Sequence, residues 1–312
     1  KAKDTRNEIE ILMPVVHEAV KNSKLARQEI GFTCSGSSDY LQGQSFAFVG
    51  ALDAVGAWPP IKESHVEMDG AWALYEAWIK IQTGDVDSAL VYSFGKSSPG
   101  DLPEILALQL DPYTMTPLWP DAHSLAALQA RAYLEATGKS ERELAQVVAR
   151  SQRDAVGNPH AVVRGHADVE KLLAEPYVRN PLRAHDLPPI TDGASALVVV
   201  AGERARELCE RPVWIRGFDH RIEPLGLGLR DLTRSASTEI AGQKAGVHKG
   251  KVDFAELHAP YSHQELILRA ALGLGEDVVI NPSGGALASH PLMAAGLVRI
   301  GEAASRIMAR RG

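Results

Sequence analysis

The sequence predicts an α/β fold in which βαβ units form a mostly parallel sheet in each of two similar halves. Segments with helical periodicity alternate with short apolar runs of strand length, before and after a long helical stretch. That stretch, residues 98–183, shows no strand pattern. We therefore predict an N-terminal half at 1–210 with a helical insertion at about 98–183, and a C-terminal half at 211–312 that is incomplete at its C-terminus.

The first half opens with a helix and continues with alternating strands and helices. Apolar residues at helical spacing predict a helix over 8–23, and a short apolar run predicts a strand over 30–36. We expect a largely buried helix over 68–85 and a buried strand over 88–95. After the insertion, residues 190–211 predict a turn, a Val-rich strand and a helix.

The insertion and the second half follow the same rules. Residues 121–156 predict two helices, and Ser140 with Glu143 has the spacing of a capping box for the second of them. The second half is expected to alternate strands with helices and to close on a last helix, with strands over 212–222, 251–260 and 278–285 and helices over 237–247 and 261–274.

Composition excludes several classes of function. Apolar residues make up 45% and charged residues 23%, which is typical of a protein with a real core. The net charge of −6 argues against a nucleic-acid-binding surface, which needs clustered Lys and Arg. We find no apolar run of ~18 residues for a membrane helix and no secretory signal, so a cytoplasmic location is expected. The two cysteines provide neither a disulfide framework nor a zinc ligand set.

The first candidate for chemistry is His290. It precedes Pro291 and a helix-like run, and it follows a turn that contains Asn281, Ser283 and two glycines, Gly284 and Gly285. A neutral imidazole at a helix N-terminus can polarise a carbonyl or take a proton, and Pro291 is suited to the first helical position. A histidine that only caps the helix is the alternative.

The second candidate is the segment 256–265, at the end of an expected strand. His258, Tyr261 and His263 are gathered there with Glu256, and ligands of α/β proteins bind at the carboxyl ends of strands. The two histidines lack a convincing third metal ligand, so we predict no metal site. We expect His258 to act as an acid, a base or a donor to an oxyanion, with a polar surface turn as the alternative.

Two further places carry reactive groups. Glu63, Glu67 and Asp69 crowd the start of the helix expected over 68–85, where the helix dipole alone favours acidic residues. Cys34 ends a predicted strand and is either a nucleophile or a small core residue.

Taken together, these motifs resemble the thiolase superfamily, in its branch of sterol-carrier-protein-type thiolases, lipid-transfer proteins and acetyl-CoA acetyltransferase-like proteins. "NPSGGALASHPLMAAGL" resembles the block that ends in Gly-His-Pro, and "AELHAPYSHQE" falls where the family has its Asn-Glu-Ala-Phe or His-Asp-x-Phe block. "GNPHA", "NPLRAHD" and "TDGASALVV" resemble its loop-domain and sheet-return signatures. The combination covers nearly the whole chain, in the family's order.

The resemblance implies a five-layered αβαβα fold with two similar halves and a helical loop domain. It also implies dimers or higher assemblies and substrates that are coenzyme A thioesters, with no other cofactor. His290 and His258 would be catalytic. The expected substrate-binding residues are Asn281, Ser283, Gly284, Gly285, Tyr261 and His263.

The chain departs from the family at its nucleophile. Thiolases place a cysteine in a pattern like Cys-Ala-Ser-Gly at a helix start; matching Gly70 and Ala73 to that pattern puts Glu67 at the position of the cysteine and Asp69 two places on. A carboxylate does not replace a thiolate in acyl transfer. The family's second cysteine lies in a glycine-rich segment that this sequence does not contain, and Ser289 stands where the family usually has glycine.

Three interpretations follow from these departures. The first is an enzyme that cleaves a C–C bond of a lipid or steroid acyl-CoA by a retro-aldol reaction, with Glu67 as base and His258 and His290 holding the enolate. Such enzymes often need a small OB-fold, zinc-ribbon partner. The second is a supporting subunit beside a catalytic thiolase-like chain. The third, which we favour least, is a true acyltransferase that uses Cys34. The sequence does not identify the acyl group.

Overall fold

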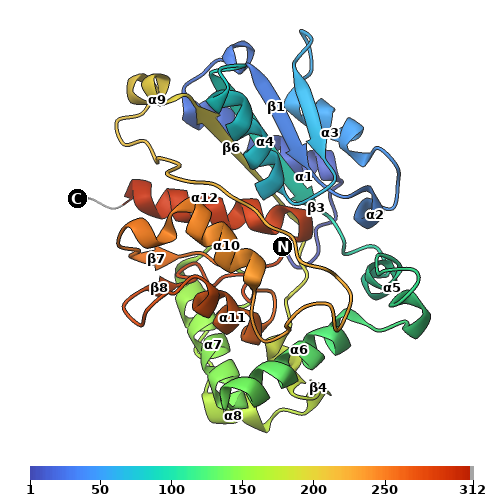
Figure 1. Cartoon of the computed structure of the whole chain (residues 1–312). Coiled ribbons are helices and arrows are strands. Elements are labelled where there is room, and N and C mark those ends of the chain that lie inside the picture. Colours follow the sequence, from blue (N-terminus) through green and yellow to red (C-terminus); the bar gives the residue numbers. More distant parts are fainter. Residues whose placement is uncertain (310–312) are drawn as a thin grey trace. The chain divides into compact units, whose positions relative to one another are not determined.

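The computed structural model describes residues 1–309, and these form two compact units (Figure 1). Unit 1 contains Lys1–Gly100, Ile190–Trp214 and the residues from His290 on. Unit 2 contains Asp101–Pro189 and Ile215–Ser289. Each unit is assembled from segments distant in sequence. The predicted division into halves at residue 211 stays a prediction.

Unit 1 contains a four-stranded sheet in the order β2-β1-β3-β6. Strands β1 (Phe32–Gly36), β2 (Glu63–Val66) and β3 (Ser88–Gly95) run parallel, and β6 (Gly193–Val200) pairs antiparallel with β3 along its whole length. All residues of β1 and β3 are buried, because these two strands are central in the sheet.

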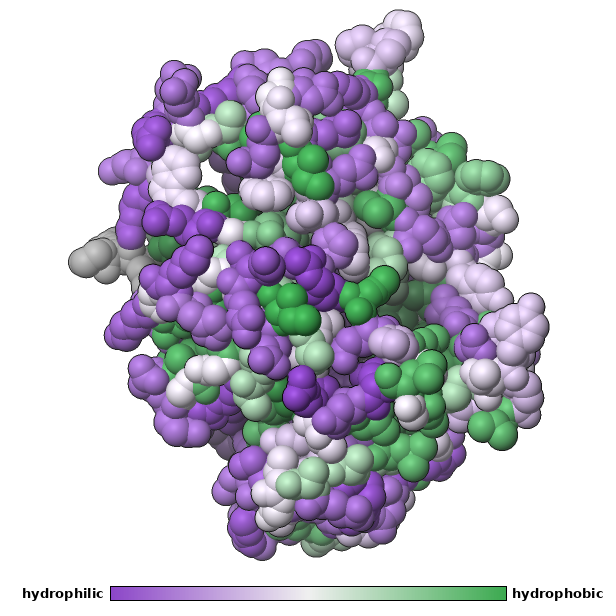
Figure 2. Space-filling model, viewed as in Figure 1, coloured by the Kyte–Doolittle hydropathy of each residue, from purple (hydrophilic) through white to green (hydrophobic). Residues whose placement is uncertain are grey.

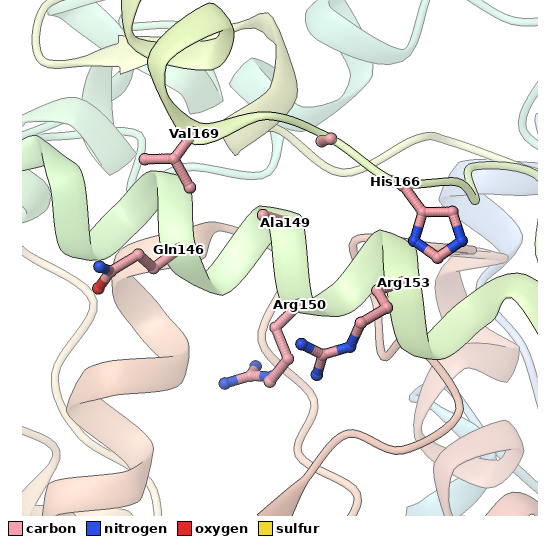
Figure 3. A pocket seen from close by; sticks show the side chains of 7 residues that line it. Gln146, Ala149, Arg150, Arg153, His166 and Val169 are labelled. Atoms are coloured by element: carbon pink, nitrogen blue, oxygen red, sulfur yellow. The ribbon is translucent and has the colours of Figure 1, made fainter.

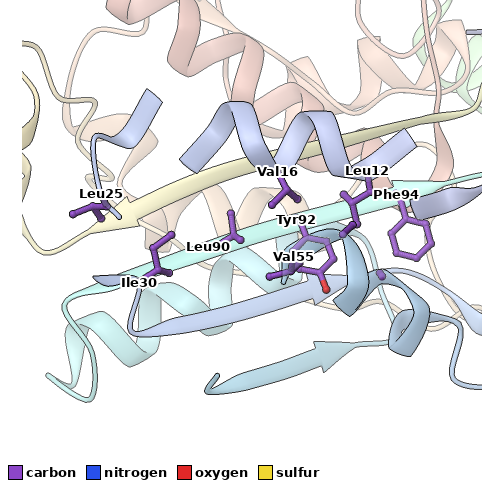
Figure 4. Close-up of a cluster of buried hydrophobic side chains, with 10 residues drawn as sticks. Leu12, Val16, Leu25, Ile30, Val55, Leu90, Tyr92 and Phe94 are labelled. Carbon is purple, nitrogen blue, oxygen red and sulfur yellow. The ribbon is translucent and has the colours of Figure 1, made fainter. Parts of the chain in front are cut away.

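One face of this sheet packs against α1 (Glu8–Ser23) and α3 (Ala47–Val55). Side chains alternate between the faces of a strand, so Leu90, Tyr92 and Phe94 of β3 point to the same side. They form a buried cluster with Leu12 and Val16 of α1 and with residues of α3 (Figure 4). The short helix α2 (Asp39–Gln42) precedes α3.

The opposite face packs against α4 (Gly70–Gln82), which begins close to β3. A Cβ added to Gly70 would lie 2.4 Å from Ser93 Oγ and 3.0 Å from Leu297 Cβ of α12 (Ala295–Ala309), so only glycine permits this approach. Helix α9 (Gly202–Leu208) follows β6. The start of α4, where the sequence places Glu67 and Asp69, is therefore fixed against the sheet.

Unit 2 is mainly helical. Helix α7 packs against α8 and α11, and a short antiparallel hairpin of β4 and β5 and a parallel pair of β7 and β8 supply its strands. Its elements are α5 (Leu102–Leu108), α6 (Ala122–Thr137), α7 (Glu141–Asp154), α8 (Val169–Ala174), β4 (Tyr177–Arg179), β5 (Leu182–Arg183), α10 (Ala236–Ala245), β7 (Phe254–Ala255), α11 (Ser262–Ala271) and β8 (Val279–Ile280). The capping box predicted for α7 is present: the Ser140 N–H donates to Glu143 Oε2 over 3.0 Å.

Five expectations about secondary structure are wrong. Residues 212–222, with an apolar pattern that predicted a strand, have no strand partner and no regular structure among the described residues. Of the strands expected over 251–260 and over 278–285, only the two-residue strands β7 and β8 form. The stretch 98–183 contains the β4–β5 hairpin. Pro291 begins a 3₁₀ turn over Leu292–Ala294, and α12 starts only at Ala295, so His290 does not lie at the α-helix start.

Hydrophilic side chains cover most of the face shown in Figure 2, with apolar residues scattered between them. Within residues 1–309 no helix has the length and apolar character needed to cross a bilayer.

Candidate active site

Glu67 lies in the turn between β2 and α4, and its side chain is 51% exposed. Its Oε1 accepts a hydrogen bond of 2.7 Å from the backbone N–H of Asp39, and its Oε2 lies 3.4 Å from Nε2 of His65. The carboxylate is thus held by two contacts within unit 1 and remains open to solvent. Such a group is able to accept a proton.

Asp69 is the N-cap of α4 and joins two helices. Its Oδ1 accepts from the Ala71 N–H over 2.8 Å, and its Oδ2 accepts from the Gly296 N–H of α12, also over 2.8 Å. Burial raises the pKa of this carboxyl, and hydrogen bonds from backbone N–H groups oppose that rise. Both oxygens have backbone partners, which indicates a structural clamp.

His290 is buried in unit 1, in the loop that leads to α12. Its carbonyl oxygen accepts from the backbone N–H groups of Thr191 (3.2 Å) and Leu292 (3.0 Å), and it forms an isolated parallel bridge with Ile190. Gly95 and Gly193 approach Pro291 so closely that added Cβ atoms would lie 3.1 and 3.2 Å from it. Backbone pairing therefore fixes the position from which the imidazole projects.

Cys34 is fully buried in β1, on the face of the sheet that α4 covers. Its Sγ lies 3.7 Å from Oε2 of Glu76. Burial and then the Glu76 charge raise the pKa of the thiol far above its usual range. Because the thiolate is the nucleophilic form, these surroundings argue against Cys34 as a nucleophile.

In unit 2, the side chain of Asn281, the first residue after β8, stabilises the turn that follows this strand. Asn281 adopts a φ of 48°, its Oδ1 accepts from the Leu257 N–H over 2.6 Å, and its Nδ2 donates to Oε2 of Glu265 over 2.7 Å. Glu265 is buried and also pairs with Arg150 of α7. The Asn281 amide is thus committed to protein contacts that link β8, α11 and α7.

The rest of this turn is equally constrained. Ser283 donates from its hydroxyl to Glu256 Oε2 over 2.7 Å, and its N–H donates to Glu256 Oε1 over 2.9 Å. Gly284 and Gly285 have φ of 95° and 66°. A Cβ added to Gly284 would lie 2.6 Å from Ala155 Cβ. The predicted role of Asn281, Ser283, Gly284 and Gly285 in substrate binding stays a prediction; the structure shows a rigid turn.

Three further candidates follow β7 in unit 2 and differ in exposure. His258 is exposed. The Tyr261 hydroxyl lies 3.0 Å from Nδ1 of His123, and burial raises the Tyr261 pKa to about 12. His263 is fully buried, its Nε2 lies 3.1 Å from Oε1 of Gln129, and burial lowers its pKa to about 3, so it is neutral near pH 7.

A pocket of about 340 Å³ lies between α7 and the segment that leads to α8 (Figure 3). Arg150 and Arg153 extend from α7 in the same direction, and His166 lies beside Arg153. Both guanidinium groups are already paired with carboxylates, of Glu265 and Asp154 respectively. We therefore assign no ligand to this pocket. Among residues 1–309, no group of three or more His, Cys, Asp or Glu side chains is arranged to hold a metal ion.

The structure brings Glu67, Asp69 and His290 into unit 1, and His258, Tyr261, His263 and the 281–285 turn into unit 2. Sequence reasoning overlooked His65, the side-chain partner of Glu67. The sequence did contain a signal for this contact: His65 and Glu67 are two positions apart, and alternate residues of an extended segment lie on the same face.

No family model matches the chain. Acetyl-CoA acetyltransferase of Methanothermobacter thermautotrophicus is 29% identical over 212 residues, which cover 61% of this chain and 55% of the relative. Sterol carrier protein 2 of Homo sapiens is 24% identical over 276 residues, 75% of this chain and 50% of the relative. The 17-hydroxy-3-oxo-4-pregnene-20-carboxyl-CoA lyase of Mycobacterium tuberculosis is 36% identical over 99 residues, 31% of this chain and 26% of the relative.

Two solved structures have the same fold. The "Ltp2-ChsH2(DUF35) aldolase" matches 97% of this chain and 85% of that chain with a TM-score of 0.82 and 19% identity. A monomeric SCP2-thiolase-like protein of Mycobacterium smegmatis matches 99% of this chain and 70% of that chain with a TM-score of 0.76 and 19% identity. The chain is similar in sequence to acetyl-CoA acetyltransferases and to sterol carrier protein 2, and it has a thiolase-like fold. This thiolase-like chain spans about half the length of the first two curated relatives named above.

Proposed function

We propose that this chain is a thiolase-fold enzyme that cleaves a C–C bond of a lipid or steroid acyl-CoA by a retro-aldol reaction, without a cysteine nucleophile. One observation carries the proposal. At the position that the resemblance gives to the thiolase cysteine stands Glu67, a solvent-accessible carboxylate held by two hydrogen bonds, while the thiol of Cys34 is buried in the sheet. A relative named as a CoA lyase and a neighbour named as an aldolase support this class of reaction.

The proposed reaction starts from a β-hydroxyacyl-CoA. Glu67 takes the proton of the β-hydroxyl group, the C–O bond becomes a carbonyl, and the bond between the α and β carbons breaks. Its electron pair forms the thioester enolate, which is reprotonated at the α carbon. The products are a shortened acyl-CoA and a ketone or aldehyde, and no free coenzyme A is consumed. The resemblance assigns the donors to the enolate oxygen to His290 and His258.

The proposal includes a partner. The chain would act with a small OB-fold, zinc-ribbon protein or with a second thiolase-like chain, as the name of the aldolase neighbour suggests by its two components. Coenzyme A enters as part of the substrate, and the chain itself would hold no other cofactor.

The test is a mass-spectrometric product screen on β-hydroxyacyl-CoA thioesters with steroid, branched and short acyl groups, with and without the partner and free coenzyme A. We expect a shortened acyl-CoA and a carbonyl product without added coenzyme A. Glu67→Gln should lower the rate by about 10²–10⁴-fold, as for the loss of a general base. The exposed Glu135→Gln on α6 is the matched control and should leave the rate unchanged.

A second candidate function is that of a supporting subunit for a catalytic thiolase-like chain. The observation that favours it is the contact of Glu67 Oε1 with the Asp39 N–H, which occupies one of the two carboxylate oxygens. Thioester binding without any product, with or without the partner, would support this function and contradict the retro-aldol proposal. Products that the isolated chain forms only with free coenzyme A would contradict both.

A further inference from the structure

In unit 1, two consecutive hydrogen bonds link the side chains of Ser35, His65 and Glu67. Ser35 of β1 and His65 of β2 are paired in register, and Ser35 Oγ lies 2.9 Å from His65 Nδ1. On the other side of the ring, His65 Nε2 lies 3.4 Å from Glu67 Oε2. The order is therefore hydroxyl, imidazole, carboxylate.

The packing around His65 fixes the plane of its ring. Ser35 is in register with Tyr92 of β3, so Ser35 and His65 lie on the face of the sheet that α1 and α3 cover. Phe48 of α3 stacks on the imidazole with a centroid distance of 4.2 Å and an interplanar angle of 6°. The ring is thus held between an aromatic face and two polar partners.

The partners also determine which nitrogen carries the proton. A carboxylate only accepts hydrogen bonds, so Nε2 must carry a hydrogen to bond Glu67. In the neutral ring Nδ1 is then an acceptor, and the Ser35 hydroxyl donates to it. The direction of donation runs from Ser35 through His65 to Glu67.

The same three residue types form nucleophilic triads in hydrolases, but this arrangement does not permit that chemistry. Ser35 is 0% exposed in a central strand, so no substrate reaches its hydroxyl. The group at the accessible end of the line is the carboxylate, 51% exposed, against 12% for His65. The side chains behind Glu67 therefore serve to hold it.

We propose that His65 is a positioning residue for Glu67 and that Ser35 fixes His65 as the Nε2–H tautomer. The inference rests on the proposed function for the role of Glu67 as a base. The hydrogen-bonded relay that runs from Ser35 through His65 to Glu67 is a property of unit 1, and it can be measured without any substrate.

The first test reads the tautomer of His65 by long-range ¹H–¹⁵N NMR of the histidine rings at a pH where the ring is neutral, with its signal assigned by its loss in His65→Gln. We expect the Nε2–H form in the wild type. Ser35→Ala removes the donor to Nδ1, and Glu67→Gln removes the carboxylate; each should shift the signal toward a mixture of tautomers. An Nδ1–H form in the wild type, or unchanged signals in both variants, overturns the proposal.

Ser37→Ala is the matched control. Ser37 is also 0% exposed and follows the same strand, and its hydroxyl has no hydrogen-bond partner among the described residues. This variant should leave the His65 signal unchanged, whereas a shift as large as that of Ser35→Ala would point to a general loosening of the sheet and contradict the relay.

The second test uses the cleavage reaction. His65→Gln should lower kcat by up to about 100-fold with little change in KM, since a displaced base misaligns the reaction without removing substrate contacts. In the double variant with Glu67→Gln, the loss should equal that of Glu67→Gln alone, because His65 acts only through Glu67. Additive losses would overturn the positioning role. A wild type without cleavage would contradict the proposed function, while the NMR result would still decide the relay.

Discussion

Cys34 and Glu67 show how surroundings decide what a reactive residue can do. Cys34 lies beside Glu76 of α4 and Glu67 lies just before α4, yet the thiol is buried between the sheet and α4 and the carboxylate faces solvent. A buried thiol loses the solvation that its charged form requires. This difference in solvation supports the proposed role of Glu67 as the base.

Cys34 should resist alkylation in the folded protein. Its buried thiol has a strongly raised pKa, whereas Cys209 at the end of α9 is partly exposed. We expect iodoacetamide at pH 8 to label Cys209 at least about tenfold faster, as thiolate fraction and access dictate. Peptide mass spectrometry measures both rates, and urea-unfolded protein is the control in which the two should be similar. Rapid labelling of Cys34 in the native protein would reopen its role as a nucleophile.

His263 should make the protein less stable in acid. Its pKa falls from the ordinary 6.5 to about 3 in the folded state, so between these values the unfolded chain binds a proton that the folded chain does not. Stability is fully present above pH 6.5 and falls toward pH 3, by at most about 1.4 kcal/mol per pH unit from this group.

The measurement is urea unfolding from pH 7 to pH 4. His263→Gln should show a shallower loss of stability on acidification than the wild type. The exposed His160→Gln serves as control and should keep the wild-type pH dependence. Equal slopes for the wild type and His263→Gln would contradict the assignment.

At the scale of elements, the turn after β8 depends on glycine for two separate reasons. Gly284 has a positive φ and also has no room for a Cβ beside Ala155 and Ala288. Gly138, which ends α6, has a φ of 68° with nothing within 4 Å of an added Cβ. Alanine substitutions at Gly138 and Gly284 therefore separate the free-energy cost of the backbone conformation from the cost of steric overlap.

Gly138→Ala should destabilise the protein by about 1 kcal/mol through its backbone conformation alone. Gly284→Ala should cost about 2–4 kcal/mol, since overpacking adds to the same backbone penalty. Denaturant midpoints at pH 7 measure both changes. Equal costs at the two positions would show that the turn relaxes to admit a methyl group.

Most helices were predicted correctly because each has its own signal in the sequence. The helix over 8–23 matches α1, and the capping box of Ser140 and Glu143 begins α7 as expected. The strand expected over 212–222 does not form, because a strand requires a neighbouring strand for its backbone hydrogen bonds. An apolar alternation shows that a segment is able to pair, but no residue of 212–222 belongs to a strand in the described part of the chain.

At the scale of the whole molecule, a partner should determine activity. The first two curated relatives named above match this chain over about half of their own length. We expect the chain with a small OB-fold, zinc-ribbon protein to form a stable complex by size-exclusion chromatography and to cleave β-hydroxyacyl-CoA at least about tenfold faster than the chain alone. Lack of complex formation with such proteins, together with full activity of the isolated chain, would contradict the partner proposal.

The sequence by itself determined the thiolase-like fold, since the order and spacing of its motifs are a property of the chain. Through its resemblance to thiolases it also predicts that Glu67 stands at the position of the nucleophilic cysteine. Only the tertiary structure decided which groups are solvated and which are buried, because burial depends on segments that are distant in sequence. Burial of this kind argues against Cys34 as a nucleophile, makes Asp69 a clamp between two helices, and places Ser35 and His65 behind Glu67.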